Sequence, residues 1–219
     1  MMTQECETQM VATRLRIIDA AKKVLCEQGI AKTTMREVAK AASLTRGSIY
    51  WHFKDKNELL LELRRALLAP VMDRIEGILS SERQTDPLDA IELALLTFFR
   101  YLDENPIVLQ LYENMAMRCE QPDQFSRVQA EINSAIICSL CQVEHAYRRA
   151  MAQGSLSSHL DPFAVAWDTF SFANGLLHLA IAWPATNDSE KHTQDMIASH
   201  MALRRQRGSL PTLTERRVA

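Results

Sequence analysis

The sequence predicts an all-helical protein, and three observations support this. The 219 residues are 47% hydrophobic, which is enough to bury a core. Apolar residues recur at helical spacing, interrupted by only 6 glycines and 7 prolines. Capping side chains stand directly before several of those prolines. We expect about nine helices, arranged as a helix-turn-helix domain over residues 1–56, a helical domain over residues 57–207 and a flexible tail over residues 208–219.

The first expected helix covers residues 13–28. Its apolar residues lie three or four positions apart, the spacing of one buried helix face. They are Leu15, Ile18, Ala21, Val24 and Leu25. Gly29 follows and can adopt the left-handed conformation that ends a helix.

A pair of short helices follows. Thr34 and Glu37 have the spacing of a capping box, in which each side chain accepts a hydrogen bond from the other residue's backbone N–H. The second helix should therefore start there and end near Ala42. Thr45 can cap a third helix that runs through Phe53. The result is two short helices joined by a tight turn.

The third helix has an unusual aromatic run. Tyr50, Trp51 and His52 are consecutive, so they point around the helix and cannot all be internal. Some of them must face solvent or a partner. The alternative is a helical hairpin packed inside a larger bundle.

The same helix has features suited to a DNA groove. Gly47 and Ser48 are small and allow a surface to approach the backbone, while Arg46 can reach a guanine edge or a phosphate. Residues 12–56 carry ten basic and four acidic residues, whereas residues 57–219 carry fifteen basic and twenty-one acidic residues. A basic first domain on an acidic second domain favours a polyanion as partner of the first domain only.

Residues 13–63 resemble the DNA-binding domain of the TetR family, and residues 46–56 are most similar to its AcrR-like branch. The resemblance implies a homodimeric repressor of double-stranded operator DNA. It implies phosphate contacts from Thr34, Thr45, Tyr50, His52 and Lys56. It places Arg46, Gly47, Ser48 and Trp51 at or near the floor of the groove.

The second domain starts with another helix cap. Asp55 can cap a connecting helix with Glu58 at its third position, and this helix should reach about Ser80. The pairs that begin with Asp86, Asn105 and Asp161 each place a capping residue before proline. The further expected helices cover 87–104, 107–117, 123–153, 161–183 and 189–207.

The last two helices carry more apolar surface than one neighbouring helix can cover, which favours a four-helix dimer interface. The predicted interface residues are Phe163, Ala166, Leu177, Ile181, Met196 and Met201. A core within a single chain remains the alternative for about half of the apolar positions on these two helices.

The middle helices are expected to form a ligand pocket. Its candidate lining is Phe98, Gln110, Tyr112, Met115, Glu131, Trp167, Phe170 and Asn174. Ordinary core packing is the alternative for each of these residues. The resemblance implies a small lipophilic inducer, often a cation, and control of an efflux pump. We expect no cofactor.

A thiol- or metal-sensing repressor of the same fold is the alternative function. Cys138, Cys141 and His145 share one helix face, but no fourth metal ligand is evident, so buried packing is favoured for them. Enzyme motifs are lacking, which leaves a DNA-binding activator or nucleoid-type protein as a further rival. With no export signal, no apolar span and an odd number of cysteines, we expect a cytoplasmic protein without a membrane partner.

Overall fold

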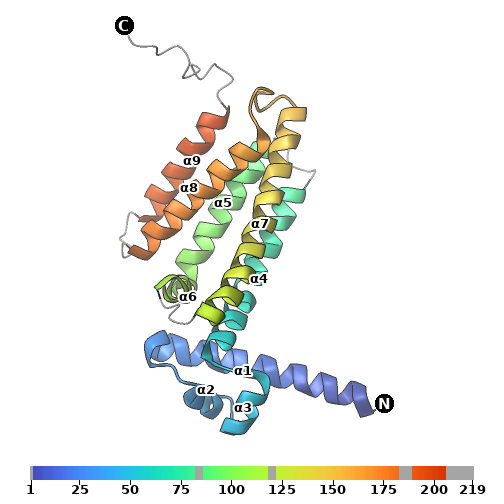
Figure 1. The fold of residues 1–219 in the computed structure, drawn as a ribbon. Coiled ribbons are helices and arrows are strands. Elements are labelled where there is room, and N and C mark those ends of the chain that lie inside the picture. Colours follow the sequence, from blue (N-terminus) through green and yellow to red (C-terminus); the bar gives the residue numbers. More distant parts are fainter. Residues whose placement is uncertain (1, 82–85, 118–121, 183–188, 206–219) are drawn as a thin grey trace. The chain divides into compact units, whose positions relative to one another are not determined.

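The computed structural model describes residues 2–81, 86–117, 122–182 and 189–205 (Figure 1). Within these ranges the chain forms nine α-helices and no strand, so the predicted fold class is confirmed. The helices are α1 (Met2–Lys32), α2 (Met35–Ala41), α3 (Arg46–His52), α4 (Lys56–Ser80), α5 (Pro87–Glu104), α6 (Pro106–Met117), α7 (Pro122–Ala152), α8 (Pro162–Ala182) and α9 (Ser189–Arg205). None of the described helices has the length and apolar character needed to cross a bilayer.

Proline starts four of these helices, as its fixed φ and missing N–H favour. In α5, Asp86 accepts a hydrogen bond from the backbone N–H of Leu88 (2.9 Å). In α8, Asp161 accepts one from the backbone N–H of Phe163 (3.1 Å). The helix starts predicted after Asp86 and Asp161 are therefore confirmed.

The first helix is longer than predicted. It starts at Met2 instead of near residue 13, and Leu15 is exposed, so the buried stripe begins at Ile17. Acidic residues close to a helix N-terminus favour the added turns because they interact well with the helix dipole. Gly29 ends the regular helix as expected: its φ of 76° and ψ of 166° lie in a region that is essentially restricted to glycine.

The chain divides into two compact units, which we describe separately. Unit 1 comprises Met1–Asp73 and Tyr101–Ile132, and unit 2 comprises Arg74–Arg100 and Asn133–Ala219. This division reflects which segments pack together. The predicted boundary after Lys56 instead separates a DNA-binding domain from a ligand-binding and dimerisation domain, and it stays a prediction. The predicted tail, residues 208–219, lies outside the described residues.

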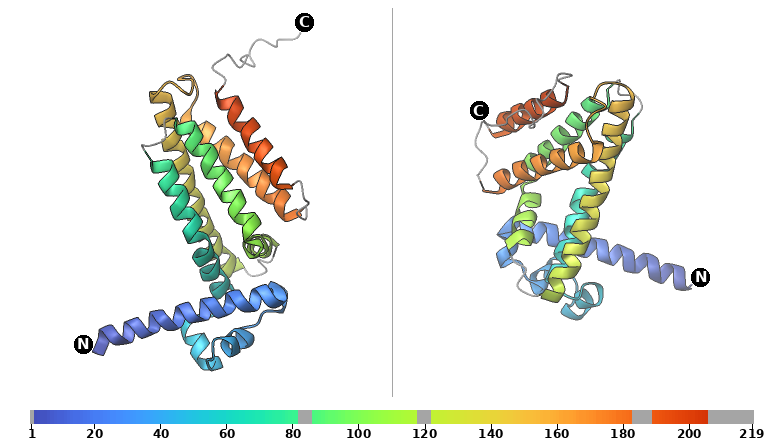
Figure 2. Two further views of the ribbon diagram at one scale, coloured as in Figure 1. Left: turned by 180° about the vertical axis from the view of Figure 1, so that it is seen from behind. Right: turned by 45° about the horizontal axis from the view of Figure 1, so that its top comes forward.

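Unit 1 contains the helix-turn-helix. Helix α1 packs against α2 and α6, and α2 packs against α3. Both short helices lie on the same side of α1 (Figures 1 and 2). The fully buried side chains Ile17, Val38, Ile49, Phe53 and Leu63 form the centre of this packing.

The turn between α2 and α3 is closed by a Schellman motif. The N–H of Leu44 donates to the carbonyl of Ala39 (2.8 Å), and the N–H of Ser43 donates to that of Lys40 (3.1 Å). Ser43 occupies the left-handed position of this motif with a φ of 54°. Glycine is the preferred residue there because an L side chain is strained in that conformation.

We therefore expect Ser43→Gly to raise the free energy of unfolding by about 0.5–1 kcal/mol. Urea denaturation of the two proteins measures this difference. Ser43→Ala is the control, because it removes the hydroxyl and keeps the strain. A Ser43→Gly protein no more stable than the wild type would contradict the expectation.

A chain of hydrogen bonds joins three helices of unit 2. The hydroxyl of Tyr147 on α7 is 2.7 Å from Oγ1 of Thr169 on α8, which is 3.2 Å from Nε2 of His200 on α9. The ring of Phe172 stacks on His200 with centroids 4.1 Å apart. Helices α8 and α9 lie side by side in both views of Figure 2. This buried network therefore fixes their register.

Burial lowers the pKa of His200 below its usual value of 6.5. As pH falls through 6.5 the unfolded chain takes up a proton more readily than the folded one, so this residue makes the protein less stable toward acid. His200→Gln can still bond Thr169 but does not titrate. We expect urea denaturation at pH 8 and pH 5.5 to show a smaller loss of stability in this variant than in the wild type. Equal losses would contradict the role given to His200.

Candidate nucleic-acid interface

Helix α3 is capped and anchored by a few side chains. Thr45 Oγ1 accepts a hydrogen bond from the backbone N–H of Ser48 (3.1 Å), as its predicted capping role requires. Ile49 and Phe53 are fully buried and hold the helix on the domain. The remaining face is open, because Tyr50 is 43% exposed and Trp51 is 77% exposed. The predicted outward orientation of the aromatic run is therefore confirmed for these two residues, and His52 is half-buried.

Arg46 lies at the start of this open face. Its guanidinium carbon is 5.7 Å from the centroid of the Tyr50 ring, within cation–π range. The side chain is exposed and has no ion pair with any residue that the structure describes. A free guanidinium beside an exposed aromatic surface is suited to a phosphate or a guanine edge.

Gly47 has no packing reason to be glycine. A Cβ added to it would meet only Thr45 Oγ1, at 3.9 Å, which is ordinary van der Waals contact. Glycine in a helix costs roughly 1 kcal/mol relative to alanine. The protein itself therefore gains nothing from a missing side chain here, which points to an external surface that approaches the backbone.

Arg14 of α1 positions the end of α3, a role that the sequence did not reveal. Its Nη1 donates to the carbonyl of His52 (2.7 Å), and its guanidinium carbon is 4.3 Å from the centroid of the Phe53 ring. Its Nη2 is 3.7 Å from Glu62 of α4. One side chain therefore ties α3 to both α1 and α4.

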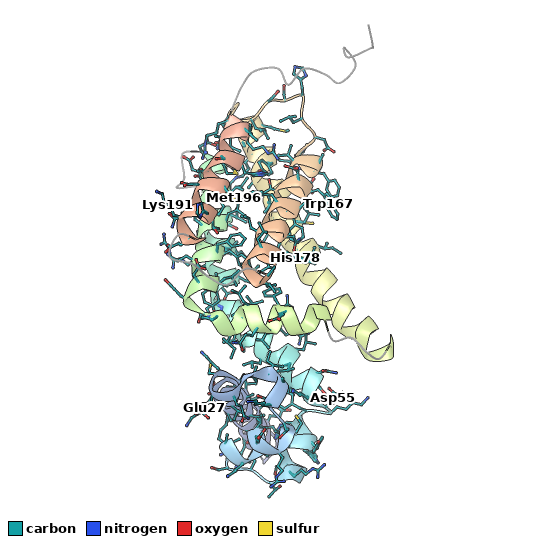
Figure 3. The ribbon with its side chains drawn as sticks, turned by 90° about the vertical axis from the view of Figure 1, so that its left-hand side faces the viewer. Glu27, Asp55, Trp167, His178, Lys191 and Met196 are labelled. Carbon is teal, nitrogen blue, oxygen red and sulfur yellow. The ribbon has the colours of Figure 1, made fainter. Side chains whose placement is uncertain are left out.

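The start of α4 is held by polar contacts. Asp55 accepts from the backbone N–H of Glu58 (2.9 Å), which confirms its predicted capping role, and Figure 3 shows Asp55 in unit 1. Lys56, predicted to bind phosphate, is half-buried and donates from Nζ to the carbonyl of Ile30 (2.6 Å).

Thr34 and Glu37 form the predicted capping box of α2. The N–H of Glu37 donates to Thr34 Oγ1 (3.3 Å), and the N–H of Thr34 donates to the Glu37 carboxylate (2.9 Å). Bonds from the side chain and then the backbone of Thr34 lower the pKa of Glu37. The hydroxyl of Thr34 also donates to this carboxylate, so the predicted phosphate contact requires it to turn away.

Comparison with known proteins identifies the domain that carries this interface. Residues 17–63 match the family model for bacterial regulatory proteins of the tetR family. This match identifies residues 17–63 as a DNA-binding domain of the TetR type. The regulator TtgR of Pseudomonas putida is 29% identical over 187 residues, which cover 85% of this chain and 89% of TtgR. The regulator AcrR of Shigella flexneri is 26% identical over 197 residues, which cover 90% of this chain and 91% of AcrR.

A solved structure supports the same assignment. SmeT, described as the repressor of the Stenotrophomonas maltophilia multidrug efflux pump SmeDEF, is 26% identical and has a TM-score of 0.70. The match covers 94% of this chain and 97% of SmeT. The predicted likeness to AcrR-like members of the TetR family is confirmed, and the chain is a transcriptional regulator, not an enzyme.

The structure of unit 2 separates the predicted dimer residues into two groups. Phe163 and Met196 are exposed and Ile181 is half-buried. Ala166, Leu177 and Met201 are buried within the chain itself. The alternative of an intramolecular core therefore describes these three residues better than a contact with a partner.

An apolar face that contains the predicted residue Met196, and two residues that the sequence did not single out, runs beside the seam between α8 and α9. Leu179 is 53% exposed, Met196 is 43% exposed and Leu203 is 61% exposed. Leu179 lies two turns from Phe172 on α8, while Met196 and Leu203 lie one turn either side of His200 on α9. Because Phe172 stacks on His200, all three lie along one seam, which we call the α8–α9 face. Figure 3 shows Met196 on α9.

The predicted ligand residues of this regulator fall in both units. Gln110 and Tyr112 belong to unit 1, and Phe98, Phe170 and Asn174 belong to unit 2, where they are half-buried. Trp167 is exposed on α8 and stacks on Phe163 with ring centroids 6.0 Å apart, a position that favours an outer surface (Figure 3). The side chains of Met115 and Glu131 lie outside the described residues. The pocket stays a prediction.

The favoured interpretation of the cysteine pair as core was wrong. Cys138 and Cys141 are free thiols exposed on α7, and His145 is exposed beside them. The inward face of α7 is filled instead by buried residues such as Leu140 and Tyr147, which lie on the other side of the helix. Within the described ranges no three potential ligands come together as a metal site.

Proposed function

We propose that the chain is a homodimeric repressor that inserts α3 into the major groove of a palindromic operator. The single observation that supports this most is the open face of α3, where Arg46, Gly47 and Trp51 are exposed beside a buried anchor at Ile49. A capped helix with a free arginine and a small residue at its start has the features that groove entry needs.

The α8–α9 face supports the homodimer. Leu179, Met196 and Leu203 are large apolar side chains left in solvent on two adjacent helices. Pairing this face with its copy about a two-fold axis would bury all three in a four-helix bundle. The symmetric dimer would present two α3 helices, which fit successive major grooves when they are about 34–36 Å apart.

Release of the repressor from its operator by a small lipophilic molecule would complete the mechanism. A ligand that binds better to a dimer with another spacing of its α3 helices shifts the population away from the DNA-binding form. The description of one relative supports an efflux pump as the controlled system, because SmeT is described as the repressor of a multidrug efflux pump. Such a regulator would act in the cytoplasm.

Selection of bound fragments from random duplex DNA tests this proposal. We expect an inverted repeat to be enriched, and a footprint on it that a lipophilic ligand removes. Enrichment of no sequence would contradict the repressor and favour a nucleoid-type binder. A site without two-fold symmetry would contradict the homodimer.

Gly47→Ala separates folding from DNA binding. Because a Cβ fits at this position, we expect the substitution to stabilise the protein by up to about 1 kcal/mol. The added methyl group would nevertheless weaken operator binding if the backbone lies against DNA. Thermal denaturation and a mobility-shift titration measure the two effects. Unchanged operator affinity would show that no surface approaches Gly47.

Thiol sensing is the second candidate function, and the exposure of Cys138 and Cys141 favours it. Solvent-accessible thiols three residues apart on a helix can be reached by an oxidant. The Cys138→Ser, Cys141→Ser double variant should then bind operator normally but resist release by peroxide. Equal release of both proteins by peroxide would exclude this candidate.

A further inference from the structure

Arg64 of α4 is a buried arginine that forms no ion pair with a carboxylate among the described residues. It is only 8% exposed, and its Nε is buried and has no acceptor among the residues that the structure describes. Its guanidinium carbon lies 5.0 Å from the centroid of the Tyr112 ring on α6. Both helix segments belong to unit 1.

Two other arginines have a buried Nε without an acceptor, but their environments differ. Arg204 of α9 forms an ion pair with Asp168 of α8. Arg149 of α7 is only half-buried, so water reaches part of its side chain. Arg64 therefore stands apart as a deeply buried arginine whose charge no described carboxylate neutralises.

A charge in this position is unfavourable for the ligand-free protein. Arginine cannot lose its proton at physiological pH, and a buried ion without a partner keeps the cost of its lost hydration. Tyr112 covers the guanidinium with its ring and supplies no acceptor in that contact. The buried Nε–H still has no acceptor among the described residues, and a carboxylate can accept from Nε and the adjacent Nη in two parallel hydrogen bonds.

We propose that Arg64 anchors a ligand site between α4 and α6 that takes a small organic carboxylate with an apolar, preferably aromatic, body. The carboxylate would neutralise the guanidinium, and the body would lie among the apolar residues near Tyr112. This inference rests on the proposed ligand-responsive function and narrows it. It replaces the cationic inducer that the family resemblance implies with an anionic one.

The same helix connects this site to the DNA-binding head. Arg64 is two residues from Glu62, which lies 3.7 Å from Arg14, and Arg14 donates to the last residue of α3, His52. A shift of α4 on ligand binding would therefore act directly on the contacts that hold α3. This provides a physical route from the anion to the recognition helix within unit 1.

Calorimetric titration of the full-length, DNA-free protein tests the proposal with three matched probes: 2-naphthoate, neutral 2-naphthamide and cationic 2-naphthylmethylamine. We expect naphthoate to bind about 10-fold or more tightly than the amide, and the amine to bind least. Equal affinity for naphthoate and the amide, or preference for the amine, would overturn the proposal.

Substitutions then assign the effect to this residue. Arg64→Met should lose the preference for naphthoate, and its Tm without ligand should rise by about 2–4 °C because the buried charge is gone. Arg64→Lys keeps the charge but not the two-bond geometry, so an intermediate preference is expected. If Arg64→Met still prefers naphthoate to the amide as strongly as the wild type does, Arg64 is not the anchor of the carboxylate.

Glu131→Gln tests whether the chain supplies its own carboxylate. Naphthoate binding by this variant but not by the wild type would mean that the site is already filled, and would overturn the proposal. Operator binding by the ligand-free protein is measured separately on the selected duplex. If the wild-type protein does not bind naphthoate but does bind the selected duplex, only this inference is refuted. If no duplex can be selected, the proposed function is refuted.

Discussion

Met196→Glu is expected to convert the dimer into monomers and to reduce operator affinity by about 10³-fold, to the level of non-specific binding. Met196 is 43% exposed in the single chain, so the fold itself tolerates a glutamate there. At a two-fold interface the same change buries two carboxylates close together, which is strongly unfavourable. Light scattering at micromolar concentration and a mobility-shift titration measure the two effects.

Ala198→Glu is the matched control. Ala198 is also exposed on α9, but it lies two positions further along and so points to nearly the opposite side of the helix. It should remain a dimer with normal operator affinity. If Met196→Glu stays dimeric, or if both variants dissociate alike, the α8–α9 face is not the interface.

Arg46→Ala is expected to lower operator affinity by about 5- to 150-fold, the equivalent of about 1–3 kcal/mol for a bidentate contact to guanine. The fold should be unaffected, because Arg46 is exposed and its guanidinium lies against the exposed Tyr50 ring. Titration against the selected duplex and its single-base variants shows whether discrimination at one base pair is also lost.

Lys54→Ala separates base reading from general electrostatics. Lys54 is an exposed basic residue just after α3, so its removal should weaken binding to all duplexes by a similar, smaller factor. If Arg46→Ala behaves like Lys54→Ala, with discrimination intact, Arg46 contacts only the DNA backbone.

The helices were largely predictable because their ends depend on local chemistry. Thr34, Thr45 and Asp55 each accept the backbone hydrogen bond that their spacing predicted. The start of α1 was not predictable, because the polar residues before Thr13 lack an apolar stripe and still form helix. Ser43 was also missed, because a serine in the left-handed position of a turn gives no sequence signal comparable to glycine.

The open face of α3 was predictable from three consecutive bulky residues, which cannot share one side of a helix. Contacts between distant segments were not predictable. Arg14 and Arg64 are ordinary basic residues in the sequence, and their roles depend on which helices pack beside them. The exposure of Cys138 and Cys141 was likewise decided by tertiary packing, which turned the other side of α7 inward.

Two copies of α3 are expected to enter the major groove of one symmetric site. Methylation interference tests it directly, because a methyl group on guanine N7 blocks the major groove only. On the selected duplex we predict two symmetric clusters of interfering guanines, about one helical turn or a multiple of it apart, with the signal at one guanine of each cluster lost in Arg46→Ala. Interference from adenine N3 in the minor groove alone, or from a single unrepeated cluster, would contradict this mode of DNA binding.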